Sequence, residues 1–167
     1  KKQCQRSLEY SLSSALKNKH LQVHMQPIVD QKSTQIVGCE SLLRWNDPVE
    51  GNVSPAIFIP LAESLGLIEE LTYFVLRKVL KTIKINQDLF EDKYISVNIS
   101  RNVVSNSNFA HKVSGIFKRN PEILKQVVFE VTEDGECSDA DMTKIKENLT
   151  KLANMGVKVA IDDFGTG

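Results

Sequence analysis

Hydrophobic residues in the N-terminal part of this chain follow two patterns in succession, first a helical spacing and then a strand-like alternation. Leucine and alanine first recur at three- and four-residue spacing, which predicts an amphipathic helix that ends near Asn18. Apolar and polar residues then alternate over Leu21–Met25, as expected for a strand, and we expect Pro27 to stop this strand. The sequence predicts a turn around Asp30–Thr34, followed by a second strand over Ile36–Trp45.

The rest of the chain alternates between predicted helices and predicted strands. Ser54 and Pro55 indicate a helix start, because a hydroxyl cap is followed by proline at the first helical position. We expect Pro60 to break or kink this helix and Gly66 to cap its end. The later predicted elements are a helix from about Glu69 to Asn86, a strand at Tyr94–Ile99, a helix near Asn108–Lys118, a strand at Val127–Val131, a helix over Asp139–Met155 and a strand at Val157–Ile161.

This order of elements predicts an α/β fold with a parallel sheet and right-handed crossovers. Asn98, Glu130 and Asp162 lie near the carboxyl ends of successive strands, about one βα unit apart. A (β/α)8 TIM-like barrel collects its functional residues at this end, and a whole barrel takes about 250 residues. We therefore predict an incomplete barrel of about five strands, short by roughly three βα units. The single domain covers 1–167, with an N-terminal helix in 1–19 and the barrel elements in 20–167.

Charge and composition narrow the class of protein. The formal net charge is zero, which argues against a general DNA or RNA binder but leaves room for a local site that holds one phosphate ligand. Cys4, Cys39 and Cys137 are far apart and lack zinc-ligand spacing, so we expect free thiols in a reducing compartment. No apolar run reaches the roughly 18–20 residues of a membrane span. We expect a cytoplasmic segment without membrane contact, although an anchor upstream of Lys1 is compatible with the sequence.

Polar residues on strands that should be mostly apolar form the candidate site. A buried carboxylate is costly unless it is paired, and several carboxylates at one barrel mouth raise one another's pKa. A divalent cation resolves that conflict, and oxygen ligands without His or Cys favour Mg²⁺ or Mn²⁺ over zinc. Two adjacent carboxylates can also serve two metals about 4 Å apart. The candidate residues are Glu40, Asn98, Glu130, Asp162 and Asp163.

Each candidate also has an ordinary structural interpretation. A lone glutamate such as Glu40 is usually solvated or paired, and an asparagine such as Asn98 usually serves in a turn or a cap. The pair 162–163 can simply mark the exit from a strand into a loop. Arg44 can pair with Glu40, and Gln26 can be a polar strand end. The residues taken one by one leave these alternatives open.

Taken together, six segments of the chain resemble the EAL family of bacterial phosphodiesterase domains. The second reads E-S-L-L-R-W, where the family's signature is E-A-L-L-R-W. The segments occur in the family's order and at its usual spacing, and the resemblance covers nearly the whole chain from Ser7 onward. They are Met25–Asp30, Glu40–Trp45, Ser54–Glu63, Val97–Ser100, Phe129–Glu133 and Asp162–Gly167.

The resemblance implies a metal site and a reaction. Glu40, Asp162 and Asp163 match the residues on which catalysis depends. The family binds Mg²⁺ or Mn²⁺ and hydrolyses cyclic di-GMP to linear pGpG. The implied ligands of the first metal are Glu40, Asn98, Glu130 and Asp162, and Asp163 matches the aspartate that serves a second metal.

The resemblance also implies substrate contacts and a dimer. Arg44 matches an arginine that holds a substrate phosphate, for which a guanidinium fork is well suited. Gln26 matches a polar ligand contact, and Leu42 lines the pocket. The loop that begins at Phe164 matches one that shapes the family's homodimer interface.

Two departures from the family pattern leave alternatives open. Ser41 replaces the signature alanine; the alternation turns it away from the Glu40 face, and its hydroxyl needs a partner. The chain ends at Gly167, before the family's later lysine, glutamate and glutamine. An inactive cyclic di-GMP receptor or a protein-interaction module on the same fold is the rival interpretation. The segment by itself is expected to be inactive, because an unclosed barrel exposes sheet edges.

Overall fold

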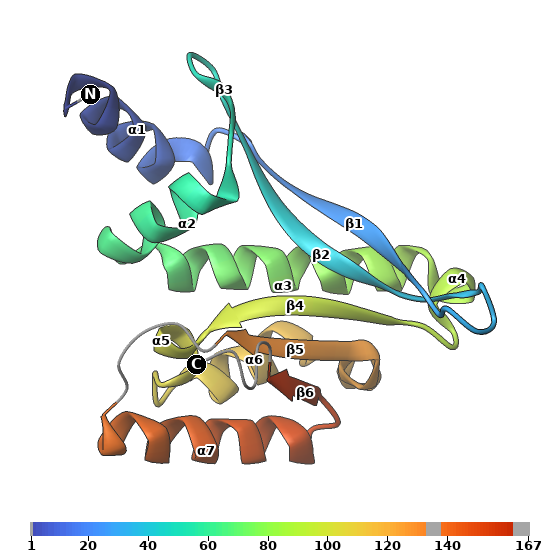
Figure 1. Ribbon diagram of the computed structural model, residues 1–167. Helices are drawn as coiled ribbons and strands as arrows, with labels where there is room; N and C mark the ends of the chain where they lie inside the picture. Colours follow the sequence, from blue (N-terminus) through green and yellow to red (C-terminus); the bar gives the residue numbers. More distant parts are fainter. Residues whose placement is uncertain (1, 133–137, 162–167) are drawn as a thin grey trace.

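The computed structural model describes residues 2–132 and 138–161, and it has strands and helices in alternation (Figure 1). No helix in these two ranges is both long and apolar enough to cross a bilayer. The elements, in chain order, are α1 (Lys2–Ala15), β1 (Leu21–Val29), β2 (Ile36–Asp47), β3 (Gly51–Val53), α2 (Pro55–Ser64), α3 (Ile68–Ile85), α4 (Gln87–Phe90), β4 (Tyr94–Ser100), α5 (Arg101–Val104), α6 (Phe109–Phe117), the 3-10 helix η1 (Pro121–Gln126), β5 (Val127–Thr132), α7 (Asp139–Asn154) and β6 (Lys158–Ile161).

The strands form one sheet in the order β1-β2-β4-β5-β6, and β3 pairs with β2 off this path. The first two strands are an antiparallel hairpin, whereas β2, β4, β5 and β6 are parallel to their neighbours. Helices separate the parallel strands along the chain, as the sequence predicts. The predicted α/β class with a parallel sheet is therefore confirmed.

The prediction that Pro27 stops the first strand is wrong. Strand β1 continues to Val29, and Pro27 pairs with Cys39 in the hairpin register. Because β1 is the outermost strand of the described sheet, a proline without an N–H group is tolerated there. The predicted turn follows: Asp30 Oδ1 accepts hydrogen bonds from the backbone N–H groups of Lys32 and Ser33, at 3.1 Å and 2.7 Å.

Helix α2 is not broken at Pro60, although a proline inside a helix removes one backbone hydrogen bond. Phe58 and Ala62 on either side of it are completely buried, so tertiary packing holds the helix together across this point. Gly66 follows the helix with a positive φ of 68°, which confirms the predicted glycine cap. The short elements β3, α4, α5 and η1 were not predicted, because so few residues show no periodicity.

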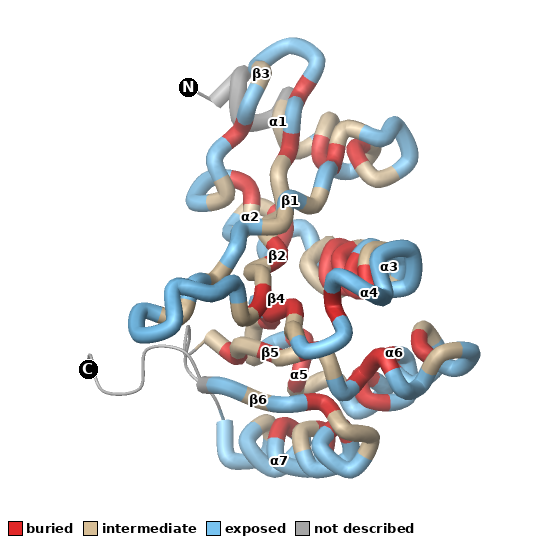
Figure 2. Tube along the Cα trace, turned by 90° about the vertical axis from the view of Figure 1, so that its right-hand side faces the viewer, coloured by how far each residue is buried: buried red, intermediate tan, exposed pale blue. Residues whose placement is uncertain are grey.

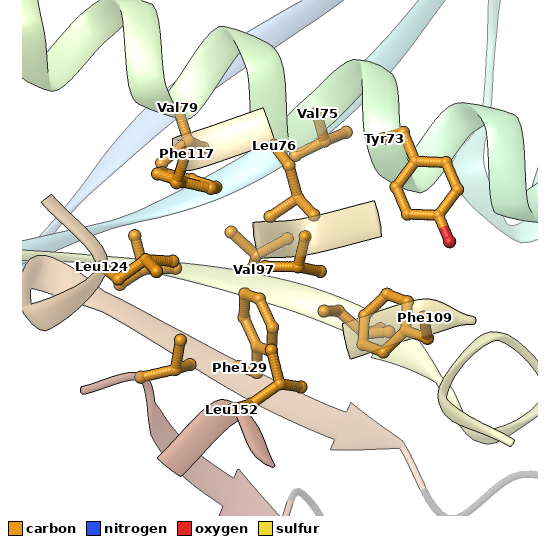
Figure 3. Close-up of a cluster of buried hydrophobic side chains, with 14 of the residues drawn as sticks. Tyr73, Val75, Leu76, Val79, Val97, Phe109, Phe117, Leu124, Phe129 and Leu152 are labelled. Atoms are coloured by element: carbon orange, nitrogen blue, oxygen red, sulfur yellow. The ribbon is translucent and has the colours of Figure 1, made fainter. Parts of the chain in front are cut away.

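A layer of helices covers one face of the sheet through an apolar core (Figure 3). Leu76 and Val79 of α3 lie over Val97 of β4 and Phe129 of β5, and all four side chains are almost fully buried. Phe109 of α6 continues this contact, with its ring centroid 6.1 Å from that of Phe129. Since strand side chains alternate between faces, the residues next to these core positions point away from the helices.

A polar cluster joins helix α3 to helix α6 at the edge of this core. Glu69 Oε1 accepts hydrogen bonds from Tyr73 Oη at 2.9 Å and from Lys112 Nζ at 2.6 Å. Its Oε2 accepts a third from Asn106 Nδ2 at 3.0 Å. The hydrogen bond from Lys112 is the main cause that lowers the pKa of Glu69, whereas burial raises the pKa of Tyr73. The carboxylate form of Glu69 therefore stabilises the contact between the two helices.

We predict that Glu69→Gln lowers the free energy of unfolding at pH 7 by about 1 kcal/mol, because a charge-assisted cluster becomes a neutral one. A lowered folded pKa means that this stability is complete above the unfolded pKa of about 4.3 and is lost as the pH falls through the folded pKa. Urea unfolding at pH 7 and pH 3 checks this, with exposed Glu70→Gln as the matched control. An equal loss at both pH values would contradict it.

Candidate functional site

The β1–β2 hairpin brings the predicted ligand contacts onto one face of the sheet. Gln26 pairs directly with Glu40 in the antiparallel register, and Leu42 and Arg44 follow at two-residue steps along β2. Directly opposed residues in an antiparallel pair project to the same side. Cys39 and Leu43, which alternate with them, pack against the helix-side core. Gln26, Glu40, Leu42 and Arg44 therefore share the face turned away from α3.

Strands β4 and β5 add two more predicted residues to this face. Asn98 pairs with Glu130 in the parallel register, so the two side chains lie next to each other. Asn98 Nδ2 donates a hydrogen bond of 2.8 Å to Glu40 Oε1, which joins β4 to β2. Glu40 and Glu130 are half-buried, and Asn98 is exposed. Three adjacent strands thus bring together three of the predicted metal ligands.

The donor set suits a hard divalent cation, although the described part of it is incomplete. Two carboxylates and an amide supply only oxygen donors, as Mg²⁺ and Mn²⁺ prefer. Because Asn98 uses its nitrogen toward Glu40, its carbonyl oxygen is the end that can contact a cation. Within 2–132 and 138–161, no three His, Cys, Asp or Glu side chains gather in a metal-binding group. Asp162 and Asp163, which were predicted to complete the set, lie outside the described residues.

A cavity of about 290 Å³ opens beside these residues, near the carboxyl ends of β2 and β4. Leu42, Arg44 and Asn98 line this cavity, whereas Gln26, Glu40 and Glu130 are not in its wall. Its other side includes residues that were not predicted to contact a ligand, of which the polar or exposed ones are Pro60, Glu63, Thr72, Ser100 and Thr132. The sequence predicted helix α2 from Ser54 and Pro55, but no local pattern indicates that a helix folds over a strand end.

Arg44 does not neutralise Glu40 in the described structure. Its Nη1 donates a hydrogen bond of 3.0 Å to the Leu43 carbonyl, and no ion pair joins it to Glu40 in the described structure. The simple pairing that the sequence left open is therefore not formed. Arg44 also lines a second cavity of about 410 Å³, together with Gln22, His24 and Trp45. The remaining guanidinium N–H groups can reach an anionic ligand from between these two cavities.

Ser41 behaves as the alternation predicts. Its side chain is 4% exposed, on the face opposite Glu40, and Ser41 Oγ donates a hydrogen bond of 2.7 Å to the Ser96 carbonyl. The hydroxyl that replaces the signature alanine therefore has the partner that a buried polar group needs. This substitution leaves the polar face unchanged.

Comparison with known protein families assigns most of the chain to one family. A model of the EAL domain matches residues 9–167, which is most of the chain. The chain belongs to the EAL domain family. The predicted resemblance is confirmed, and the parallel sheet described above is the first part of an EAL-type barrel.

The relatives of this EAL domain include named enzymes. It is 34% identical over 164 residues to the bifunctional diguanylate cyclase/cyclic di-GMP phosphodiesterase MucR of Pseudomonas aeruginosa, which covers 98% of the chain and 24% of MucR. It is 30% identical to the probable cyclic di-GMP phosphodiesterase PdeN of Escherichia coli, covering 93% of the chain and 30% of PdeN. The chain therefore spans about a quarter to a third of these two curated relatives.

Solved structures have a similar fold. The PaMucR phosphodiesterase in complex with c-di-GMP superposes with a TM-score of 0.86 at 34% identity, over 96% of this chain and 65% of that one. The EAL enzyme Bd1971, bound to cAMP and cyclic di-GMP, has a TM-score of 0.78 at 29% identity, over 98% of this chain and 45% of that one. The fold of this EAL domain is thus similar to that of two proteins whose solved structures contain cyclic di-GMP.

We predict that Ser41→Ala changes the free energy of unfolding by less than about 1.5 kcal/mol, because one buried hydrogen bond to the Ser96 carbonyl is lost and no cavity forms. Ser41→Leu overpacks the buried face of β2 and costs about 1–3 kcal/mol. Urea unfolding of both variants measures the difference. Full tolerance of leucine at this position would show that Ser41 does not face the packed side of the sheet.

Proposed function

We propose that this EAL domain hydrolyses one 3′–5′ phosphodiester bond of cyclic di-GMP to give linear pGpG. The observation that supports it most directly is the hydrogen bond between Asn98 and Glu40, with Glu130 in register beside Asn98. This arrangement gathers oxygen donors from three strands on one face, next to a cavity lined by Arg44. Relatives that are named as phosphodiesterases of cyclic di-GMP support the same substrate.

Glu40, Asn98 and Glu130 would hold a Mg²⁺ or Mn²⁺ ion, with Asp162 as a further ligand and Asp163 at a second metal. When bound, such an ion stabilises charge on the phosphoryl group and lowers the pKa of water. The protein's own contribution is to hold the donors before the ligand arrives. Asn98 fixes one Glu40 oxygen by a hydrogen bond of 2.8 Å, and the rigid β2–β4 pairing sets the spacing between them.

Arg44, Leu42 and Gln26 would place the substrate on this face. The guanidinium group of Arg44 offers a planar fork to a phosphate oxygen, which orients the scissile bond and stabilises its charge. Leu42 supplies an apolar wall in the cavity beside the ligand. Gln26 lies directly opposite Glu40, so its amide can contact the ligand at the edge of the metal site.

The proposal extends to the assembly and its place in the cell. A homodimer that forms through the loop beginning at Phe164 agrees with the family resemblance, although Phe164 lies outside the described residues. A cytoplasmic location agrees with the free thiol of Cys39 and with a second-messenger substrate.

We predict that Glu40→Ala in the intact domain lowers the turnover of cyclic di-GMP by at least about 100-fold, because a charge-stabilising ligand is lost. Chromatographic measurement of pGpG in the presence of Mg²⁺ or Mn²⁺ checks this. Glu91→Ala, an exposed glutamate remote from the site, is the matched control and retains activity. Near-normal turnover by a folded Glu40→Ala protein would refute the metal assignment.

We predict that Arg44→Ala weakens binding of cyclic di-GMP by about 10- to 100-fold, because a hydrogen-bonded charge contact to phosphate is removed. Calorimetry with and without Mg²⁺ measures the affinity, and exposed Arg119→Ala is the control. Unchanged affinity of Arg44→Ala would contradict the phosphate role. Tight binding without any pGpG from the wild-type domain would instead identify the inactive receptor.

A further inference from the structure

A basic groove runs between α3 and α6, on the side of the sheet opposite the proposed active site. Its volume is about 480 Å³, and α3 and α6 lie next to each other there (Figure 2). Leu80 and Ile116, both half-buried, form its apolar floor. The cations that line it are Arg77, Lys81, Lys84, Lys118 and Arg119. Both walls belong to the described part of this chain.

The positive charge of this basic groove is not neutralised within the described residues. None of its five cationic side chains forms an ion pair or a hydrogen bond there, and no carboxylate lines the groove. The nearest acidic residue along the chain, Glu122, accepts a hydrogen bond from Asn120 Nδ2 at 3.2 Å. The whole chain has zero formal net charge, so the excess of cations is a local property of this surface.

Helix electrostatics account for only part of this pattern. Lys84, Lys118 and Arg119 lie at the carboxyl ends of α3 and α6, where cations interact favourably with the helix dipole. Arg77 and Lys81 lie in the middle of α3, where the dipole gives no such gain. Together with Lys84 they follow one face of α3 over about 10 Å, at steps of four and three residues. The dipole does not explain that row.

Gly115 is a second, independent sign of an external partner. It lies inside α6 and in the wall of the groove, where glycine costs about 0.5–1 kcal/mol relative to alanine. No atom of the described structure lies within 4 Å of the position that a Cβ would take, and the φ of Gly115 is not in the left-handed region. Nothing within the described chain therefore requires glycine. Close approach of a partner's backbone to the helix would favour a residue without a Cβ.

We propose that this groove binds an acidic amphipathic helix of a partner protein. Carboxylates spaced by one helical turn match the cationic row, and apolar side chains between them match the floor of Leu80 and Ile116. A nucleic-acid backbone would gain nothing from an apolar floor. A flat anionic bilayer would not reach the half-buried floor. The exposed apolar residues that adjoin the groove, Ile85 and Leu89, are followed by acidic Glu91, whose charge disfavours an anionic bilayer.

The test uses the intact domain and fluorescein-labelled peptides designed as amphipathic helices, with leucines on one face and glutamates beside them. Fluorescence anisotropy measures their affinity. Lys81→Glu combined with Lys118→Glu is expected to weaken binding by about tenfold, because two exposed ion pairs become repulsions. Gly115→Leu is expected to do the same by filling the groove, and Gly115→Ala is expected to weaken binding by about threefold or more, because its Cβ would meet the partner's backbone.

The matched controls are Lys146→Glu combined with Lys151→Glu on α7, and Ser114→Leu beside Gly115, which leave peptide affinity unchanged. All variants are expected to hydrolyse cyclic di-GMP to the same extent as the wild-type domain, whether or not that domain is active. Peptide binding therefore tests the groove independently of the proposed activity. The proposal is overturned if no peptide binds saturably, if the controls weaken binding equally, or if peptides with Gln for Glu bind as well. Binding to vesicles of equal parts phosphatidylcholine and phosphatidylserine, without peptide binding, would assign the groove to membranes.

Discussion

The two-residue period of the strands, held in a fixed register, is the constraint on which this molecule depends. In β4, Val97 and Ile99 enter the core against α3, so Asn98 between them must face the other side. Phe129 and Val131 place Glu130 on that side of β5 in the same way. A slip of one residue in either strand would bury a polar group and expose a core residue. The apolar packing on one face of the sheet therefore fixes the orientation of Asn98 and Glu130 on the other face.

A second set of contacts lies at the end of β2, close to Arg44 along the chain. Asp47, at the end of β2, is 4% exposed and accepts hydrogen bonds from Ser11 of α1 and from the backbone N–H groups of Val49 and Glu50. Burial acts to raise the pKa of Asp47, but these hydrogen bonds outweigh it and the pKa is lowered. The N-terminal helix is thus attached to the turn that leads from β2 into β3, three residues beyond Arg44.

The helix layer gives the domain two chemically different sides. One side presents Glu40, Asn98 and Glu130, whose oxygen atoms suit a cation and whose neighbour Arg44 suits a phosphate. The other side presents free cations above an apolar floor, which suits a protein segment with carboxylates. The core between them is continuous, from Leu76 of α3 to Phe129 of β5. A ligand on one side and a partner on the other would therefore act on the same strands.

The sequence by itself determined the order of the elements, the parallel sheet and the family, because periodicity and the E-S-L-L-R-W motif are local properties. It also determined that Glu40, Leu42 and Arg44 share a face, since alternation along one strand needs no partner. Only the tertiary structure decided that Gln26 lies opposite Glu40, that Asn98 bonds to Glu40, and that α2 continues past Pro60 beside the cavity. These facts depend on register between strands and on packing of Phe58 and Ala62, which arise from residues distant in the chain.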